Sequence, residues 1–434
     1  MTSSGSAPRA GGDFADYISR SQAAGRLVVQ PRMGMADPAE MRAGLLAVRD
    51  ARAATVGTIT LDSYTRVNDH DRARHVLAAG GRLNGYPIVA HSRPDTARML
   101  AGVASDEFAI QVRHGSACPR QIFTAMIQAG LHATEGGPIS YCLPYSREPV
   151  AAAVEHWTAC CELLTKTAQH GGNPHLETFG GCMLGQLCPP GMLIAISILE
   201  GLFFRSHGLR SVSLSYAQQT NPAQDLEALA VLRQIVGELL HDVDWHIVVY
   251  AYMGLYPRTS GGARRLLAEA AELAVRGGAA RLIVKTTAEA HRLPTIAENV
   301  AALEFAAAAA ERHRGLRTGG DAPETGIYSE ARALIDAVLE LDDDIGRAMV
   351  LAVQRGYLDI PYCLHPDNAG RARAGIDPEG RLQWTAVGSL PLSCPPASAL
   401  ANQSGSADLL AAIGFVARKF DAAAAGAPDV RTLH

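Results

Sequence analysis

The chain has 434 residues, of which 39 are Lys or Arg and 43 are Asp or Glu, so its formal net charge is -4. That length suits one large barrel with an appended region better than one compact core of ordinary size. The charge balance shows no basic excess and the arginines form no runs, so nucleic acid is not an expected partner.

The first dozen residues are small and polar without an apolar core, which predicts a tail rather than a targeting segment and a cytoplasmic protein. The most apolar stretch, Gly191 to Phe204, contains Glu200 and is shorter than the roughly 20 residues that cross a bilayer. We interpret it as a buried helix and expect no membrane association. The eight cysteines have no CxxC spacing and are expected to be reduced thiols.

Short apolar runs alternate with longer helical segments along most of the chain, a pattern typical of βα units around a parallel sheet. Eight strands are predicted, at Leu27 to Gln30, Val56 to Leu61, Tyr86 to Ala90, Phe108 to Val112, Leu131 to Thr134, Val212 to Tyr216, His246 to Ala251 and Leu282 to Lys285. Eight units favour an α/β fold, the closed (β/α)8 TIM barrel, whose catalytic groups lie on the loops after the strands. A doubly wound open sheet is the alternative, but no GxGxxG follows the first strand.

The predicted organisation has three parts: residues 1–25 as a tail and lead-in, 26–317 as the barrel, and 318–434 as a smaller C-terminal α+β region. The Gly-, Pro- and Asp-rich segment Thr318 to Thr325 is predicted as a linker. Beyond it, Glu330 to Gln354 has helical periodicity. Asp359 to Tyr362 and Leu382 to Trp384 are predicted as short strands, and Ala422 to Ala427 as a frayed end.

Arginine recurs just past the ends of three predicted strands, as Arg32, Arg66 and Arg113. One such arginine is as readily a surface ion pair, but three after neighbouring strands indicate a shared pocket. The planar guanidinium holds a carboxylate in two parallel hydrogen bonds. Three of them predict a ligand with more than one carboxylate, a small dicarboxylate.

An acid follows the next strand as Glu135, and Gly136 and Gly137 after it allow close backbone approach. Its carboxylate is suited to a ligand ammonium group or to accepting a proton, and the alternative is a helix cap or an internal partner for an arginine. Two tyrosines four residues apart, Tyr141 and Tyr145, are suited to lining a mostly apolar pocket with hydroxyl donors.

The Gly- and Pro-rich segment from Gly171 to Pro190 is long for a βα connection and is predicted as a lid or ligand wall, with Glu177 and Phe179 as its contacts. Lys285 and Glu289, four residues apart, form either an ion pair at a helix start or a pair that grips ribose hydroxyls. The histidines lack metal-ligand spacing, so no metal site is expected.

These motifs occur together in one known family. They are Gln30-Pro31-Arg32, Asp62-Ser63-Tyr64-Thr65-Arg66, Leu83-Asn84-Gly85, Arg113-His114-Gly115, Glu135-Gly136-Gly137, Ile139-Ser140-Tyr141, Pro144-Tyr145 and Val284-Lys285-Thr286. From about Arg26 to Asn368-Ala369-Gly370, the chain resembles the large, epsilon, subunit of methylaspartate mutase, also called glutamate mutase.

The resemblance implies a (β/α)8 barrel that interconverts L-glutamate and (2S,3S)-3-methylaspartate with adenosylcobalamin. The implied reaction begins with homolysis of the cobalt to carbon bond, and the substrate then fragments to a glycyl radical and acrylate, which recombine. By resemblance, the substrate is bound by Arg32, Arg66, Arg113, His114, Glu135, Tyr141 and Tyr145. The implied catalytic residues are Glu135, Tyr145 and Glu177, and the implied cofactor-binding residues are Gly34, Asn84, Pro144, Phe179, Lys285, Glu289 and Leu293.

The DxHxxG sequence that supplies the cobalt-ligating histidine in the family's small subunit does not occur in this chain. The resemblance therefore implies a separate cobalamin-binding partner and a heterotetramer with two copies of each chain. Two alternatives stay open: a non-catalytic barrel paralogue that binds a dicarboxylate, and a lyase in which Lys285 is a Schiff-base nucleophile.

Overall fold

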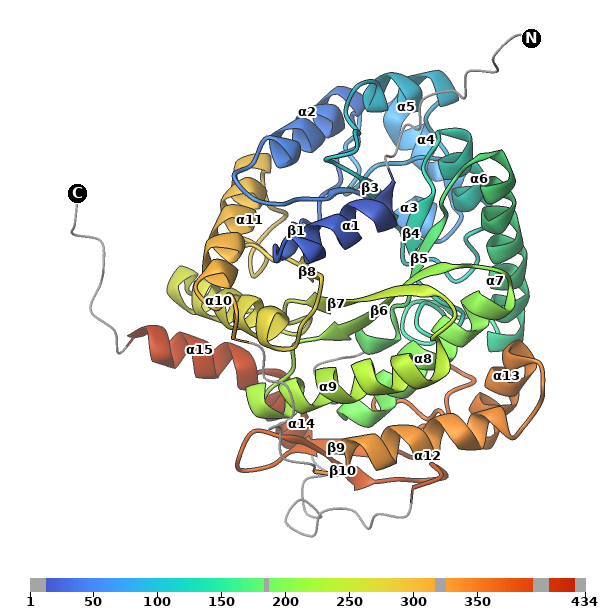
Figure 1. The fold of residues 1–434 in the computed structure, drawn as a ribbon, viewed down its shortest axis with the longest axis vertical. Coiled ribbons are helices and arrows are strands. Elements are labelled where there is room, and N and C mark those ends of the chain that lie inside the picture. The colour runs from blue at the N-terminus through green and yellow to red at the C-terminus, as the bar shows by residue number, and fades with distance from the viewer. Residues whose placement is uncertain (1–12, 183–186, 317–324, 393–405, 426–434) are drawn as a thin grey trace.

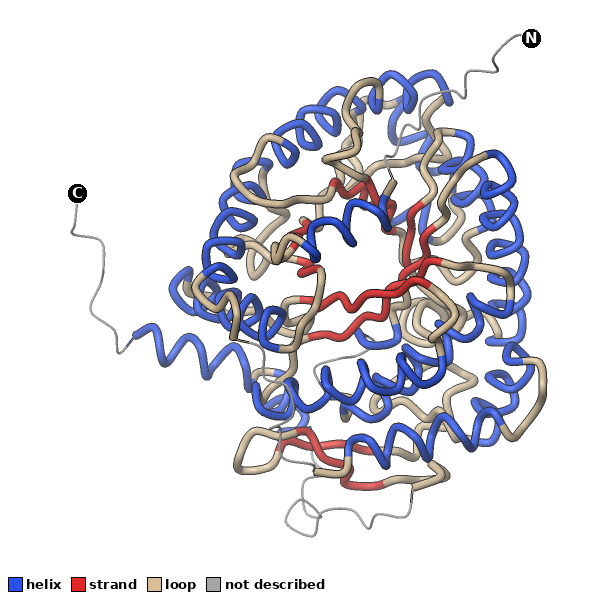
Figure 2. The backbone as a smooth tube through the Cα atoms, viewed as in Figure 1, coloured by secondary structure: helices blue, strands red, loops and turns tan. Residues whose placement is uncertain are grey.

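The computed structural model of the chain describes residues 13–182, 187–316, 325–392 and 406–425. Within these residues, eight parallel strands form a central ring with helices around it (Figure 1), and Figure 2 shows the same ring as red strands inside blue helices. The strands are β1 Val28–Gln30, β2 Gly57–Thr60, β3 Ile110–Arg113, β4 Ala133–Glu135, β5 His175–Glu177, β6 Ser211–Ala217, β7 Asp244–Tyr250 and β8 Arg281–Ile283.

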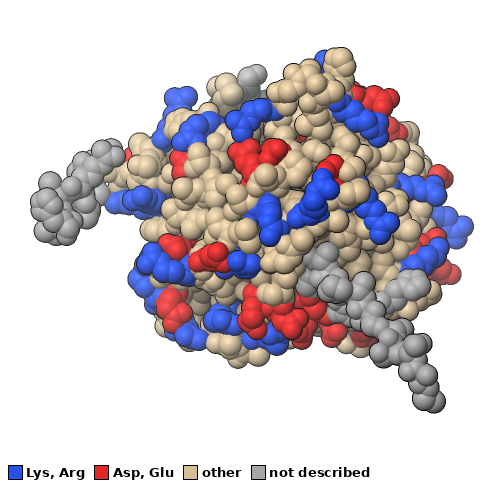
Figure 3. All heavy atoms as spheres, turned by 90° about the horizontal axis from the view of Figure 1, so that it is seen from above, with Lys and Arg blue, Asp and Glu red and all other residues tan. Residues whose placement is uncertain are grey.

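One helix precedes the first strand, and the others connect the strands or cover the outside of the ring. They are α1 Phe14–Ala23, α2 Pro38–Arg49, α3 Ser63–Arg66, α4 His70–Ala78, α5 Arg93–Leu100, α6 Arg120–Gln128, α7 Val150–Thr165, α8 Pro190–Ser206, α9 Pro222–Leu239, α10 Ser260–Arg276 and α11 Ile296–Glu311, with short 3-10 turns η1 Lys166–His170 and η2 Gly180–Cys182. On the face seen in Figure 3, basic and acidic side chains are intermixed rather than gathered by sign.

The ring is closed, as the βα pattern predicts. Hydrogen bonding runs in the order β1-β8-β7-β6-β5-β4-β3-β2, and the last gap is bridged where the amide of Val29 donates to the carbonyl of Ala54 at 2.9 Å. The predicted (β/α)8 barrel is therefore confirmed.

One of the strand predictions is wrong, and one strand was not predicted. Tyr86 to Ala90 makes a single bridge to Leu61 and then turns, because Pro87 lacks an amide and its carbonyl accepts from Ala90 and His91. The segment predicted as a lid contains the missing strand, β5. Its side chains at His175 and Glu177 are polar and point into the barrel, so the run lacks the apolar signature of a buried strand.

Helix α1 lies across the N-terminal opening of the barrel (Figure 1). It begins after Asp13, whose carboxylate accepts from the amide of Asp16. Its buried residues Phe14, Tyr17 and Ile18 pack on the first residues of the strands and seal that end of the barrel; these partners are Val28, Val56, Ala109, Ala133 and Ala280.

The stretch predicted as a buried helix is α8, and that prediction is confirmed. It is buried on nearly every side because it packs on β6 and is covered by α9 and by α12 Ile327–Leu339. Among the described residues, no helix is both long enough and apolar enough to cross a bilayer.

The C-terminal residues extend the same hydrophobic core, since buried side chains of α12 and of α13 Ile345–Arg355 belong to the cluster that packs between the barrel strands and the surrounding helices. The remaining elements are β9 Arg373–Ile376, β10 Leu382–Ala386, α14 Ser406–Ile413 and α15 Phe415–Ala425. The domain division at residues 317 and 318 stays a prediction, and nearly all of the predicted linker lies outside the described residues.

Two C-terminal predictions are corrected. Asp359 to Tyr362 is a loop, because the buried carboxylate of Asp359 accepts from the backbone amides of Gly370, Arg371 and Ala372 in place of a strand ladder. Ala422 to Ala425, predicted as a frayed end, is the last turn of α15. The predicted strand Leu382 to Trp384 is confirmed as part of β10.

Replacing Phe14 with Ala should destabilise the barrel. Phe14 is 2% exposed, and its ring lies 4.8 Å from that of His175 and 4.9 Å from the guanidinium carbon of Arg281. Loss of the ring leaves a cavity at the base, so the free energy of unfolding should fall by about 3–5 kcal/mol in urea titrations. Leu410→Ala, at a 68% exposed position, is the control and should change it by less than about 0.5 kcal/mol. Equal effects would contradict the sealing role of α1.

Candidate functional site

Side chains from the carboxyl ends of the strands enclose a cavity of about 350 Å³ at the open end of the barrel. Eight of the predicted site residues line it together: Arg32, Arg66, Arg113, His114, Glu135, Tyr141, Tyr145 and Phe179. Thr60, Ser63, Val67, Gly115 and Met253 complete the lining. Catalytic groups of TIM barrels lie at this end.

The three arginines reach the cavity from different strands and in different states. Arg113 ends β3 and is buried, and its Nε donates to Glu135 at 2.6 Å. Arg32 follows β1 and pairs with Glu289 at 3.2 Å. Arg66 ends α3, and its Nε is buried without a hydrogen-bond partner among the described residues. A guanidinium carries five N–H donors, so each arginine keeps donors for a ligand anion.

Helix α3 places Arg66 through a cap at its start. The side chain of Asp62, directly after β2, accepts from the amides of Tyr64 and Thr65. That cap turns the chain sharply at the strand end, so Arg66 faces the cavity one helical turn later.

Glu135 ends β4 and is held by three donors. Arg113 and the hydroxyl of Tyr250, at 2.7 Å, contact one carboxylate oxygen, and the hydroxyl of Tyr141 contacts the other. Gly136 follows with a φ of 126°, and a Cβ there would lie 2.5 Å from the Tyr141 ring. The close approach that the glycine permits is therefore to Tyr141.

His114 forms part of an aromatic wall and is uncharged. Burial, together with the nearby charge of Arg66, lowers the pKa of His114 to about 3. Its Nδ1 accepts from the amide of Ser116 at 3.0 Å, so its proton lies on Nε2. The ring stacks on Trp157, with centroids 5.8 Å apart.

Tyr141, Tyr145 and Phe179 form the other wall. The ring centroids of Tyr141 and Phe179 are 4.9 Å apart, and those of Tyr141 and Tyr145 are 6.0 Å apart. Tyr141 is buried, whereas Tyr145 is half exposed at the mouth. The cavity is thus dry at its base and open at its rim.

Glu177 is outside the cavity lining and lies beneath it, fully buried at the end of β5. It accepts from Arg281, Gln111, Ser213 and Tyr250. Burial by itself would raise the pKa of Glu177, but the charge of Arg281 and the hydrogen bonds outweigh it and hold the pKa below its usual value. Its role by resemblance stays a prediction.

Lys285 and Glu289 lie beside the cavity, joined to it through Arg32. The ammonium nitrogen of Lys285 is 3.8 Å from Glu289 and 4.8 Å from the centre of the Tyr256 ring. Burial and the charge of Arg32 lower the pKa of Lys285 to about 8. A cation and an anion therefore meet at one edge of the rim.

The other predicted cofactor residues surround the mouth. Gly34 passes over the end of β2, where a Cβ would lie 2.1 Å from the carbonyl oxygen of Thr60. The side-chain oxygen of Asn84 accepts from the amide of Ser63 at 2.9 Å. Pro144 lines an adjoining hollow of about 400 Å³ that shares Arg66, Gly115 and Tyr145 with the cavity, and Leu293 is exposed on the loop after β8.

Glu200 in α8 is a site-building residue that sequence reasoning missed. Its buried carboxylate accepts from the amides of Ile139 and Ser140 on one loop and of Phe179 and Gly180 on the next. It therefore fixes both the loop that carries Tyr141 and the loop that carries Phe179. The available signal was a single acid inside an otherwise apolar helix.

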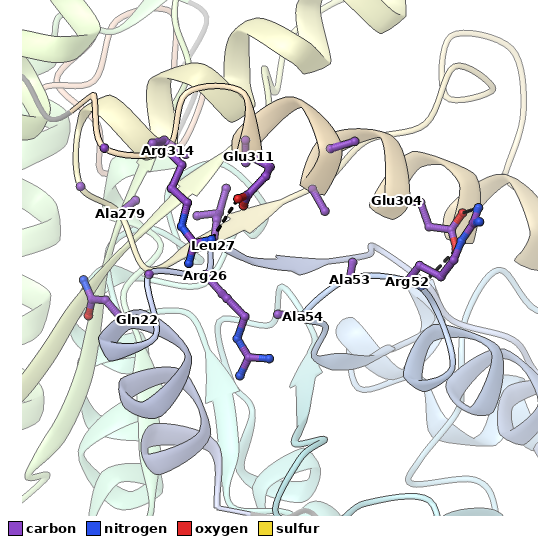
Figure 4. A pocket seen from close by; sticks show the side chains of 17 residues that line it. Gln22, Arg26, Leu27, Arg52, Ala53, Ala54, Ala279, Glu304, Glu311 and Arg314 are labelled. Carbon is purple, nitrogen blue, oxygen red and sulfur yellow. Dashed lines mark hydrogen bonds and ion pairs between the residues drawn. The ribbon is translucent and has the colours of Figure 1, made fainter.

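A larger hollow, of about 670 Å³, is at the opposite end of the barrel (Figure 4). Four of its charged side chains are engaged in pairs: Arg52 pairs with Glu304 at 3.0 Å, and Arg314 with Glu311 at 2.9 Å. It contains none of the predicted site residues, so the chemistry is assigned to the mouth.

The matching family model and the similar proteins indicate the same family. Residues 8–403 match the family described as methylaspartate mutase E chain. The glutamate mutase epsilon subunit of Haloarcula marismortui is 31% identical over 373 residues, which cover 83% of this chain and 76% of that protein. The epsilon subunits of Halobacterium salinarum and Escherichia coli O157:H7 are 31% and 29% identical, each over 87% of this chain and over 80% and 81% of their own lengths.

Glu200→Gln should loosen both loops together. The amide keeps one acceptor oxygen and turns an NH2 group toward backbone donors, so buried amides lose their partner at roughly 1–3 kcal/mol each. We expect the free energy of unfolding to fall by about 3 kcal/mol and hydrogen exchange to rise at 139–143 and 178–180. Glu155→Gln, on the exposed face of α7, is the control. Faster exchange in only one loop would contradict the shared anchor.

Proposed function

This chain belongs to the methylaspartate mutase E chain family, and from that premise we propose that it is the catalytic subunit of an adenosylcobalamin-dependent glutamate mutase that interconverts L-glutamate and (2S,3S)-3-methylaspartate. The observation that carries the proposal is the cavity that brings together three arginines and Glu135.

The charges of the cavity match those of an amino dicarboxylate. Two carboxylates need cationic partners, and Arg32, Arg66 and Arg113 supply them from three strands. The ammonium group needs an anion, which Glu135 supplies between Arg113 and Tyr141. Neutral His114 adds a donor without adding charge.

Arginines on separate strands also suit a reaction in which the carbon skeleton separates and rejoins. Each half of the substrate keeps a carboxylate, so each stays bound after the bond breaks. Holding both halves makes recombination effectively intramolecular. The buried rings of Tyr141 and Phe179 exclude water from the base of the cavity, which protects a reactive intermediate.

The rim fits the adenosyl part of the cofactor. Glu289 offers acceptor oxygens and Lys285 a donor beside the cavity, a set suited to two neighbouring ribose hydroxyls. The buried hydroxyl of Tyr256, under Lys285, has no hydrogen-bond partner among the described residues. Adenosylcobalamin, when bound, supplies radical chemistry that protein side chains lack. The residues proposed to hold it are Gly34, Asn84, Pro144, Phe179, Lys285, Glu289 and Leu293.

The rim also suits a partner subunit. Several of the exposed large apolar side chains lie on loops around the mouth: Val67, Tyr145, Leu255, Leu293 and Leu364. Arg147 ties the Leu364 loop to this rim by donating to the Leu364 carbonyl at 3.0 Å. Apolar groups gathered on one rim mark an interaction surface. We propose that the separate cobalamin-binding subunit docks there, within an assembly of two copies of each chain.

A lyase that uses Lys285 is the second candidate, because its lowered pKa of about 8 favours a nucleophilic amine. Its ion pair with Glu289 and its place outside the cavity lining favour a binding role instead. Borohydride trapping of a carbonyl substrate on Lys285 would favour the lyase.

Arg113→Lys should abolish most mutase turnover. Lysine cannot both contact Glu135 and hold a carboxylate in two parallel bonds, so kcat/KM should fall by about 100-fold, the value of one charged hydrogen-bond pair. The assay follows conversion of L-glutamate to 3-methylaspartate under anaerobic conditions, with this chain, a co-expressed cobalamin-binding subunit and adenosylcobalamin.

Arg52→Lys is the matched control, since Arg52 forms an exposed ion pair with Glu304 at the opposite end of the barrel. It should keep wild-type turnover. A wild-type complex that is folded and loaded with cofactor but converts no L-glutamate would overturn the proposed function.

Leu255→Asp should weaken the complex. Leu255 is 56% exposed on the rim, so the change should leave folding intact while placing a charge in the proposed interface. We expect the Kd for the cobalamin-binding subunit to rise at least about tenfold in sedimentation experiments. Leu410→Asp is the control, and equal Kd values for both variants would argue against docking at the mouth.

A further inference from the structure

Two carboxylates lie next to each other inside the barrel. Glu135 and Glu177 are direct register partners on β4 and β5, and both are buried. Like charges this close in a dry interior repel each other. Arg113 compensates Glu135 from above, and Arg281 compensates Glu177 from below.

The hydroxyl of Tyr250 lies between the two acids. It is 2.7 Å from Glu135, and it makes a second, shorter contact with Glu177. Arg113 Nη2 donates to the Tyr250 oxygen at 3.3 Å. A phenol has a single proton, so Tyr250 donates to one carboxylate at a time.

The two acids differ in what else can bind them. Glu177 does not line the cavity, and its other donors, Arg281, Gln111 and Ser213, all contact the same oxygen. Its remaining oxygen has Tyr250 as its hydrogen-bond donor among the described residues. Glu135 faces the cavity, where a ligand ammonium group can donate to the oxygen that Tyr250 contacts.

We propose that Tyr250 is a positioning residue whose one hydroxyl proton serves Glu177 while the cavity is empty, which leaves the facing oxygen of Glu135 to a substrate ammonium group. This inference rests on the proposed function. The phenol keeps both its proton and its direction when the ammonium group arrives. Binding of the amino acid therefore needs no net uptake or release of protons.

Tyr250→Phe tests this, because it removes the hydroxyl and keeps the ring that packs against Phe179 at 5.5 Å. Without a shared proton from Tyr250, the facing carboxylates should hold one extra proton in the empty protein. The arriving ammonium group must then expel it.

The matched control is Tyr216→Phe. Tyr216 is a fully buried tyrosine on the adjacent strand β6, and its hydroxyl donates to the buried carboxylate of Asp225 at 2.9 Å, outside the cavity lining. It loses the same kind of hydrogen bond without touching Glu135. A purely structural effect of Tyr250→Phe would appear in this variant as well.

L-glutamate binding would be measured by calorimetry in buffers of different ionisation enthalpy. The full chain would be complexed with its cobalamin-binding subunit, loaded with a cobalamin that lacks the adenosyl group so that no turnover occurs. Wild type and Tyr216→Phe should exchange no net proton. Tyr250→Phe should release about one proton, with a Kd raised about tenfold near pH 6.5 and little changed near pH 8.5.

If wild type binds L-glutamate and Tyr250→Phe matches it in Kd and proton count, the inference is overturned and the proposed function stands. Equal weakening in both Phe variants without proton release also overturns it. Failure of wild type to bind L-glutamate overturns the proposed function and this inference with it.

If Tyr250→Phe does not fold, 3-fluorotyrosine at position 250 keeps the hydroxyl and reports its surroundings by fluorine NMR. L-glutamate should then shift the resonance at position 250 and leave the resonance of 3-fluorotyrosine at position 216 in place. An unmoved signal at position 250 contradicts the arrival of an ammonium group beside Tyr250.

Discussion

The burial of Arg281 is the constraint on which the rest of the barrel depends. A cation taken fully out of water is stable only if surrounding groups replace its hydration, and removing one partner of such a buried pair costs about 3–5 kcal/mol. Arg281 obtains its partners from four other strands: Gln30 on β1, Glu177 on β5, Ser213 on β6 and His246 on β7. Gln30 also donates to Thr58 on β2 and Gln111 on β3. A one-residue shift in the register of any of these strands would turn a partner outward and leave the buried charge of Arg281 without that partner.

The walls of the cavity are held from outside the barrel. Glu200 in α8 anchors the loops after β4 and β5, and Asp421 in α15 accepts from the amides of Arg258 and Thr259 after β7. Phe420 and Val416 of the same helix pack in one cluster with Tyr252 and Tyr256. The C-terminal elements thus support the loop beneath Lys285, and rigid outer helices position the loops at the mouth.

The sequence predicted the residues that line the cavity but not Tyr250 and Arg281 beneath it. Arg32, Arg66, Arg113 and Glu135 could be predicted because each follows a strand end, where parallel strands bring their carboxyl ends together. Glu177 was placed in a lid because β5 shows polar residues where an apolar run marks a buried strand.

Neither Tyr250 nor Arg281 was predicted as a site residue. A tyrosine in a β-branched run and an arginine at the start of a strand have ordinary surface explanations, and only the closed ring turns both side chains inward. The strand count of eight was correct because the false strand at Tyr86 to Ala90 compensated for the missing β5. Local sequence patterns indicate which faces of an element are exposed and which are apolar. A polar interior is defined by contacts between segments that lie far apart in the sequence.

The packing of α1 has a consequence for synthesis. Phe14 contacts His175 of β5 and Arg281 of β8, so a helix that is synthesised before every barrel strand must wait for the last strand before all of its partners exist. Until then the apolar face of α1 is exposed, and the polar side chains of the barrel interior stay in contact with water. The growing chain is therefore expected to need protection from aggregation over most of its length, and closure of the base is a late event in folding.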